Sequence, residues 1–228
     1  MGRAKHAPSQ PSNPFHREPA APAIDPEERA PVGRDGLLGS ELYVDGPAVP
    51  PGAPAPAGPA VLRATEGSLD GDCVAVVGLH GGAGVTTVAR LLQARESDKR
   101  AGIRWVEAPG VGQLPTAGRV LLVARDSGVG LERAQHAARE WAARQIDPAV
   151  DIMGLLLVAS GPKIDGALGA QAKRVTRMWP RTWRVVWLPE WHVTASPAVD
   201  RLPGRVRRTA DSVITWAAKR RPSEGGTH

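Results

Sequence analysis

The sequence has one cysteine, few aromatic residues and no long apolar run. Its single cysteine, Cys73, excludes an internal disulfide and argues against a metal site built from cysteines. The six histidines lack the spacing of a zinc site, and neither a G-x-S-x-G motif nor a paired Cys/His arrangement is present. No apolar stretch approaches the roughly 18 residues needed to span a bilayer, and the N-terminus lacks the apolar region of a signal peptide. We therefore expect a soluble, cytoplasmic protein without a membrane span.

Proline is abundant, but it is concentrated at the start of the chain. Residues 1–60 hold 13 of the 22 prolines, interleaved with alanine and polar residues. Such a composition buries too little apolar surface to offset the entropy of ordering it. We therefore predict a disordered Pro/Ala-rich tail over residues 1–67, a folded domain over residues 68–221 and a disordered end over residues 222–228. Residues 37–44 are a local exception, which either docks on the domain or a partner, or is an apolar spot within the tail.

Apolar runs alternate with helical patterns throughout the predicted domain. Near-continuous apolar runs predict parallel strands that are buried on both faces, and amphipathic helices between them predict layers that cover those faces. The sequence therefore predicts the α/β class, with a compact parallel sheet flanked by helices. The expected strands are residues 74–77, 103–109, 119–125, 151–159 and 184–189, and the expected helices are residues 86–95, 131–141, 168–178 and 206–221.

The most informative segment is a glycine-rich loop between the first strand and the first helix. Gly81, Gly82 and Gly84 follow the strand, and a helical pattern begins at about Thr86. The backbone amides of such a loop and the N-terminus of the next helix can hold phosphate oxygens. The usual phosphate-binding loop, G-x-x-x-x-G-K-[ST], has a lysine at the position of Val85, and valine cannot replace the charge placed against the outer phosphates. A glycine-rich turn that binds no ligand is the alternative.

The loop resembles that of the ParA/MinD-type ATPases, K-G-G-x-G-K-[ST]-T. His80 and Val85 stand at the positions of its two lysines. Glu107–Gly110 resembles the D-x-P-G switch of that family, with glutamate in the aspartate position. Residues 154–160 resemble its strand that ends in a base-reading asparagine, although Ala159-Ser160 stands there instead. The resemblance covers roughly residues 72–220, and it implies a three-layer P-loop NTPase-like fold that binds ATP with Mg²⁺. The chain is also similar to an uncharacterised actinobacterial family with this degenerate loop and a proline-rich tail.

The resemblance implies a set of candidate cofactor-binding residues, but no catalytic residue. Thr86 occupies the position whose hydroxyl holds Mg²⁺, and its alternative role is to cap the N-terminus of the helix. Glu107 either holds a metal-bound water or is an ordinary solvated carboxylate. Histidine is mostly neutral at cytoplasmic pH, so His80 does not restore a fixed charge. The full candidate set is His80, Gly81, Gly82, Ala83, Gly84, Val85, Thr86, Thr87 and Glu107.

Two features towards the C-terminus allow both a functional and a structural interpretation. The net charge of +6 is concentrated there, because residues 171–228 hold twelve Lys/Arg and four Asp/Glu. This Arg-rich region can bind DNA or an acidic partner, while a GC-rich coding sequence explains its preference for arginine but not its asymmetry. Tryptophan recurs every four residues between Trp179 and Trp191. These side chains either pack in the core or form an aromatic surface for a partner.

We interpret the chain as a pseudo-P-loop protein that does not hydrolyse ATP efficiently. It would act as a binding or assembly component for an unknown protein partner, with at most weak nucleotide or anion binding. One alternative is a weak ParA/MinD-like ATPase in which His80 or an external Lys/Arg replaces the missing lysine. The other is a DNA-associated partition or mobile-element accessory factor that uses the basic C-terminal region. The sequence leaves the oligomeric state open.

Overall fold

The computed structural model describes residues 38, 41–164, 166–193 and 202–221. Their centre is a six-stranded sheet in the order β1-β8-β7-β6-β3-β4, in which β1 is antiparallel to β8 and the other pairs are parallel. A second, two-stranded sheet pairs β2 with β5. The strands are β1 Tyr43–Asp45, β2 Arg63–Ala64, β3 Cys73–Gly78, β4 Arg104–Glu107, β5 Gln113–Leu114, β6 Gly118–Arg125, β7 Val150–Val158 and β8 Arg181–Val185.

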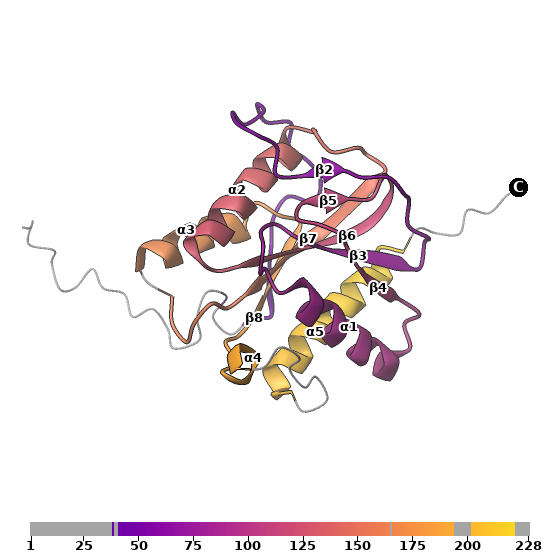
Figure 1. The fold of residues 1–228 in the computed structure, drawn as a ribbon, viewed down its shortest axis with the longest axis vertical. Coiled ribbons are helices and arrows are strands. Elements are labelled where there is room, and N and C mark those ends of the chain that lie inside the picture. The colour runs from indigo at the N-terminus through magenta and orange to yellow at the C-terminus, as the bar shows by residue number, and fades with distance from the viewer. Residues whose placement is uncertain (1–37, 39–40, 165, 194–201, 222–228) are drawn as a thin grey trace, which may run out of the picture. The chain divides into compact units, whose positions relative to one another are not determined.

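Helices cover both faces of the six-stranded sheet. α1 and α5 pack against each other on one face, and α2 and α3 pack against each other on the opposite face (Figure 1). The predicted α/β class with a mostly parallel sheet and flanking helices is therefore confirmed. The helices are α1 Val85–Lys99, α2 Gly128–Ala142, α3 Gly166–Thr176, α4 Glu190–Val193 and α5 Gly204–Lys219.

Alternate residues of the buried strands point to the two faces of the sheet. Along β3, Val74 and Val76 belong to the core beneath α1 and α5, while Ala75 and Val77 belong to the core beneath α2 and α3. All of β3 is buried, including Cys73, which is 2% exposed. Burial on both faces explains why these strands are near-continuous apolar runs in the sequence.

An irregularity in β7 reverses which face its side chains meet. The register between β6 and β7 shifts between Val120 and Leu121, so that Met153 has no partner on β6. Gly154, the next residue, has φ 151° and lies so close to β8 that a Cβ there would be 2.1 Å from the carbonyl oxygen of Arg181. Such an extra residue is a β-bulge. Glycine is required here because any side chain would push β8 away.

The N-terminal part of the described chain belongs to the fold, contrary to prediction. β1 lies at the edge of the large sheet, where Tyr43 pairs with Trp183. The side chain of Arg181 donates to Asp45 at 2.6 Å and lies 3.8 Å from the centroid of the Tyr43 ring. The structure describes residues 41–67 as part of the fold, in contrast to the predicted disordered tail. Of the alternatives for residues 37–44, docking on the domain is the one that Tyr43 and Val44 follow. Residues 1–37, 39–40 and 222–228 lie outside the described residues.

A second anchor of this segment lies on α2. Glu140 is a buried carboxylate that accepts hydrogen bonds from the backbone N–H groups of Val61 (2.6 Å) and Leu62 (2.9 Å). The next residues form β2, which pairs with β5. A proline-rich composition does not predict this docking, because the partner carboxylate lies 79 residues further along the chain.

Two tryptophans of the four-residue repeat lie in the core. Trp179 and Trp183 are fully buried, on opposite sides of the sheet. The ring centroid of Trp179 lies 6.0 Å from that of Trp141. The core interpretation of the repeat is thus correct for these two residues. Among the residues that the structure describes, no helix has both the length and the apolar character needed to cross a membrane.

Candidate functional site

The order of the strands creates a crevice at one edge of the sheet. β4 lies on one side of β3, and β6, which follows β4 in the chain, lies on the other. The chain leaves β3 towards α1 on one face of the sheet, and it leaves β6 towards α2 on the opposite face. Because these two loops diverge, a crevice remains beyond the carboxyl ends of β3 and β6. Ligands of open parallel sheets bind at this kind of position.

An open cleft of about 450 Å³ occupies this position. Its walls come from the loop after β3, the first turn of α1, the segment after β4 and the end of β6. All nine residues that the sequence predicted for a binding site line it, so the fold brings Glu107 to the glycine-rich loop. Five further residues line the cleft that the candidate set did not include, which are Gly78, Ala108, Gly110, Val111 and Arg125.

The glycine-rich loop leaves the start of α1 without an internal acceptor for its amides. Gly82 (φ 72°) and Gly84 (φ 96°) are left-handed, which glycine adopts without strain. The first hydrogen bond of the helix runs from the N–H of Val88 to the carbonyl of Gly84, and no side chain caps the helix. The N–H groups of residues 85–87 therefore have no acceptor within the helix, and they carry the positive end of its dipole. Thr86 does not cap α1.

Val85, which the P-loop resemblance places at the position of a lysine, takes part in packing. A Cβ placed on Gly78 would lie 2.7 Å from Cγ2 of Val85, so this side chain lies over the end of β3. It is also packed against the core beneath α1 and α5. Val85 is therefore an apolar contact between the loop and the sheet, and its side chain offers the cleft no polar group.

Thr86 and Glu107 form a polar pair on the opposite wall from β6. The hydroxyl of Thr86 donates a hydrogen bond to the carboxylate of Glu107 at 2.6 Å. Both side chains are exposed within the cleft. Hydroxyl and carboxylate oxygens are hard ligands of the kind that Mg²⁺ prefers. No group of three or more His, Cys, Asp or Glu side chains that would suit a metal ion occurs in the described part of the chain. Any Mg²⁺ held here would therefore keep waters or ligand oxygens in most of its positions.

His80 fastens the glycine-rich loop to β6. Its Nε2 accepts a hydrogen bond from the backbone N–H of Arg125 at 3.1 Å, and its Nδ1 lies 2.8 Å from the carbonyl oxygen of Gly81. A neutral ring with the proton on Nδ1 satisfies both contacts, because an acceptor nitrogen carries no proton. In this arrangement His80 orients the loop and supplies no positive charge.

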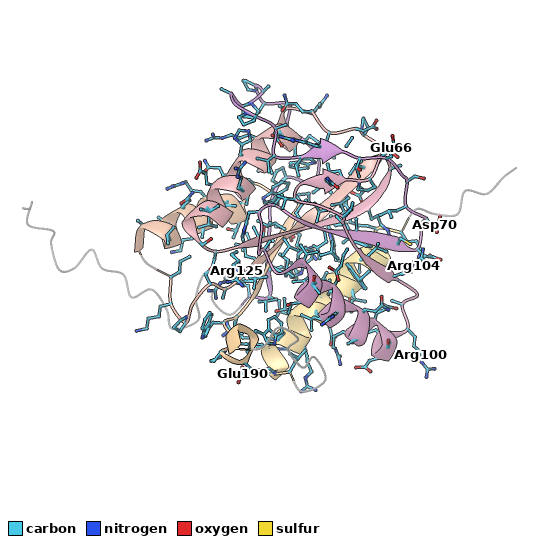
Figure 2. The ribbon with its side chains drawn as sticks, viewed as in Figure 1. Glu66, Asp70, Arg100, Arg104, Arg125 and Glu190 are labelled. Carbon is cyan, nitrogen blue, oxygen red and sulfur yellow. The ribbon has the colours of Figure 1, made fainter. Side chains whose placement is uncertain are left out.

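Arg125 brings a cation to the glycine-rich loop. It is the last residue of β6, is partly buried and lines the cleft (labelled in Figure 2). Its Nε donates to the carbonyl oxygen of Gly82 at 2.9 Å. Within the described residues, its two terminal amino groups have no hydrogen-bond partner. The signal available in the sequence was its place at the end of a predicted strand, but nothing there indicates that the side chain bends back to the loop.

Arg125 has no carboxylate partner among the described residues, unlike Arg95, Arg181, Arg184 and Arg220. Asp126, its neighbour, is 4% exposed, but it pairs with Arg184 at 2.7 Å and accepts the N–H of Ser160 at 2.6 Å. The negative charge beside Arg125 is thus already balanced, and Arg125 leaves a positive charge at the cleft. Other arginines with carboxylate partners are Arg95 with Asp211, Arg181 with Asp45 and Arg220 with Asp151.

The basic C-terminal region is divided between paired and exposed side chains. Arg220 pairs with Asp151, and Arg221 pairs with Asp72 at 2.9 Å. Arg207, Arg208 and Lys219 are exposed on α5. Part of the charge asymmetry is therefore used to attach the end of the chain to the domain, and only part of it faces solvent.

Comparisons with known proteins place the chain by family. No curated protein is similar enough to the chain to count as a relative. Residues 72–209, which include the glycine-rich loop, Glu107 and Arg125, match the model of a family of unknown function, DUF6668. This match covers more than half of the chain, and the chain therefore belongs to the DUF6668 family.

Proposed function

We propose that the cleft binds the phosphate chain of a nucleotide with Mg²⁺, and that the protein does not hydrolyse it efficiently. In this proposal the domain is a degenerate ParA/MinD-type P-loop domain that acts as a binding or assembly component for another protein. The observation that carries it is the position of Arg125. This side chain contributes an unpaired cation to a loop whose own lysine position holds Val85.

Three kinds of group in the cleft suit a phosphate chain. The amides at the start of α1 offer unpaired donors, which bind anions through hydrogen bonds and the helix dipole. Arg125 can donate two parallel hydrogen bonds from its terminal amino groups to one phosphate. Thr86 and Glu107 offer the oxygens that a phosphate-bound Mg²⁺ would use through water. A cleft of about 450 Å³ falls within the usual range of ligand sites.

Slow hydrolysis follows from the way these groups are arranged. In P-loop enzymes a lysine of the loop neutralises charge that develops on the outer phosphates during transfer. Arg125 reaches the loop from β6, and its Nε is committed to Gly82. Its remaining donors can therefore hold a phosphate chain without taking the position of a lysine at residue 85. Among the lining residues, Glu107 is the sole carboxylate, and it already accepts the hydroxyl of Thr86.

A weak ATPase is a second candidate, and Arg125 also favours it. A cation supplied by the same chain would fulfil the role that the sequence analysis assigned to an external Lys/Arg. The bonds made by His80 speak against that residue as the substitute, because they require a neutral ring. Both candidates predict that the cleft binds nucleotide. The rate of ATP hydrolysis therefore distinguishes them.

Calorimetry with Mg²⁺–ATP and with Mg²⁺–tripolyphosphate tests the proposal. We expect wild-type protein to bind both ligands, and Arg125→Gln to weaken binding by about tenfold or more, since hydrogen bonds to charged groups contribute roughly 1.5–3 kcal/mol. Arg139→Gln is the matched control, because Arg139 is exposed near the opposite end of α2. Val85→Lys should strengthen binding. If the wild-type protein binds neither ligand, the proposal is wrong and the glycine-rich loop is only a structural turn.

A DNA-associated role is a third candidate, favoured by the exposed Arg207, Arg208 and Lys219 on α5. Binding to DNA phosphates releases counterions, so the affinity should fall steeply as the salt concentration rises. An Arg207→Gln/Arg208→Gln variant should then bind less tightly and with a smaller salt dependence. Affinity for duplex DNA that is unchanged in this variant would exclude the exposed arginines of α5 as the interface.

A further inference from the structure

One wall of the cleft is formed by the residues that follow β4. Hydrogen bonds join this wall to the segment that precedes β3. Gly110 and Val111 line the cleft, and the N–H of Gly112 donates to the carbonyl of Gly78 at 2.8 Å. The far side of the same wall carries β5, which pairs with β2. The N–H of Arg63 donates to the carbonyl of Gly112 at 2.9 Å. Residues 61–65 thus lie directly behind the wall, and we call them the brace.

The brace fits closely against the wall. A Cβ on Gly112 would lie 1.9 Å from the carbonyl oxygen of Val61, so the two backbones touch at a residue with φ 66°. The N–H of Thr65 donates to the carbonyl of Leu114 at 2.8 Å. Leu62 and Leu114 are both buried. Movement of the wall by even an ångström would therefore require movement of the brace.

Glu140 holds the brace in place from the other side. Its carboxylate is 3% exposed and accepts two backbone N–H groups, from Val61 and Leu62. It also lies 3.4 Å from Nε2 of His136. A buried carboxylate is costly unless such donors satisfy it. This residue therefore favours docking of the brace where the N–H groups of Val61 and Leu62 reach its carboxylate.

We propose that Glu140 is a positioning residue for the cleft: by holding the brace it fixes the wall that carries Glu107, Gly110 and Val111. Docking of the brace raises the affinity of the cleft for its phosphate ligand. By linkage, a bound ligand strengthens docking of the brace by the same factor. The inference rests on the proposed function. It adds that docking of residues 61–65, which precede β3, controls the affinity of the same cleft. The amides of residues 85–87 and the side chain of Arg125 lie on the other walls, and Glu107 is the ligand group on this one. Glu140 does not line the cleft, so it acts without touching the ligand.

The first measurement is amide exchange read by mass spectrometry, with and without Mg²⁺–tripolyphosphate. In the wild type, the ligand should slow exchange in residues 61–65 as well as in residues 107–114. Glu140→Gln retains the shape of the side chain, but it replaces one acceptor oxygen with an amide donor. This variant should exchange faster in both segments, while the central strands β3 and β7 remain protected.

The second measurement is the affinity for Mg²⁺–tripolyphosphate, compared with a control of matched stability. Glu140→Gln should weaken binding by about fivefold or more, as expected for a coupling between sites. Val213→Ala removes buried groups from α5, on the opposite face of the sheet, and should leave the affinity unchanged. The affinities of the two variants are compared under conditions in which their free energies of unfolding are equal. Weaker binding by Glu140→Gln alone then indicates a positioning role and not general destabilisation.

A second variant acts on the brace if Glu140→Gln folds poorly. Arg63→Pro removes the N–H that bonds Gly112, and Arg63→Ala removes only the exposed side chain. We expect Arg63→Pro to weaken binding and Arg63→Ala to leave it unchanged. If the wild type binds tripolyphosphate and both Glu140→Gln and Arg63→Pro bind it equally well, the positioning role is overturned while the proposed function stands. Failure of the wild type to bind overturns the proposed function itself.

Discussion

The hydroxyl of Thr86 donates a hydrogen bond to the carboxylate of Glu107, with 2.6 Å between the two oxygens. This bond joins the first turn of α1 to the end of β4, on one wall of the cleft. It also keeps two oxygen atoms at the distance from which both can contact one hydrated cation. The pair therefore gives the cleft an acidic side opposite the basic side formed by Arg125.

The first prediction concerns Mg²⁺. Nucleotide affinity of the wild-type protein should rise when Mg²⁺ is added, because Glu107 and Thr86 help to hold the hydrated ion. Glu107→Gln should remove this dependence while leaving metal-free binding unchanged or stronger, since it also removes a negative charge from the cleft. Titrations with and without EDTA measure the effect. Glu66→Gln, at an exposed carboxylate outside the lining of the cleft, is the control and should behave as the wild type.

The second prediction concerns turnover. ATP hydrolysis should be absent or very slow, because in the proposed P-loop domain Val85 would occupy the position of the catalytic lysine, and its side chain packs over β3. Release of phosphate from Mg²⁺–ATP, followed over hours, measures it. A turnover number near that of ordinary ParA-like ATPases, lost on Thr86→Ala, would favour the enzyme candidate instead.

The third prediction concerns the buried pair of Asp126 and Arg184. Their side chains are 4% and 10% exposed, and Asp126 also accepts the N–H of Ser160. Arg184→Met should destabilise the protein by about 3–5 kcal/mol, because it leaves a buried carboxylate without its cation. Urea unfolding measures the loss. Adding Asp126→Asn to Arg184→Met should restore part of the stability. A double variant no more stable than the single one would show that charge is not the cause.

The fourth prediction concerns β1. Removing residues 1–46 should lower the stability by about 1 kcal/mol or more relative to a chain that lacks only residues 1–36, since cross-strand pairs contribute roughly 0.2–1 kcal/mol each. The lost contacts include those of Tyr43 and Asp45 with β8, the buried side chain of Leu38 and the hydrogen bond from Gly46 to Pro180. For a domain of this size, each kcal/mol corresponds to a melting temperature shift of about 2–4 °C. Equal melting temperatures for the two truncated chains would mean that β1 adds nothing to stability.

The fifth prediction concerns the bulge in β7. Gly154→Ala should destabilise the protein by at least about 1–3 kcal/mol, because its φ is strained for alanine and its Cβ would strike the backbone of Arg181. Gly71→Ala is the control, since no heavy atom lies within 4 Å of a Cβ there and its φ is not left-handed. Chemical denaturation compares the two variants. Similar stabilities would show that β7 and β8 separate at little cost.

The central part of the fold could be predicted from the sequence because its residues are buried on both faces. The apolar runs expected at residues 119–125 and 151–159 lie within one residue of β6 and β7. The glycine-rich loop and Glu107 were also recognised, and the carboxyl edge of a parallel sheet brings them together. In each case the information is local: a run of apolar residues, a glycine at a turn, or a carboxylate at the end of a strand.

The features that were missed or left open depend on partners far away in the chain. β1 is three residues long, which is too short to show a period, and it is stabilised by Arg181 and Trp183. The brace depends on a single carboxylate of α2. Arg125 was missed because the sequence gives its position at the end of β6 but not the direction of its side chain. Nothing in the neighbouring residues of these three features indicates where the partner lies.

The antiparallel edge strand constrains the order in which the chain can fold. Asp45 and Arg181 are 136 residues apart, so β1 cannot pair until almost the whole domain has left the ribosome. Contacts over such a separation are formed late, because a long loop must be closed first. During synthesis, Tyr43–Asp45 therefore remains unpaired until β8 has been made, and other chains can contact it in that time. Short length and nearby prolines prevent an unpaired edge strand from pairing with another chain, and this segment has both, with prolines at positions 47, 50 and 51.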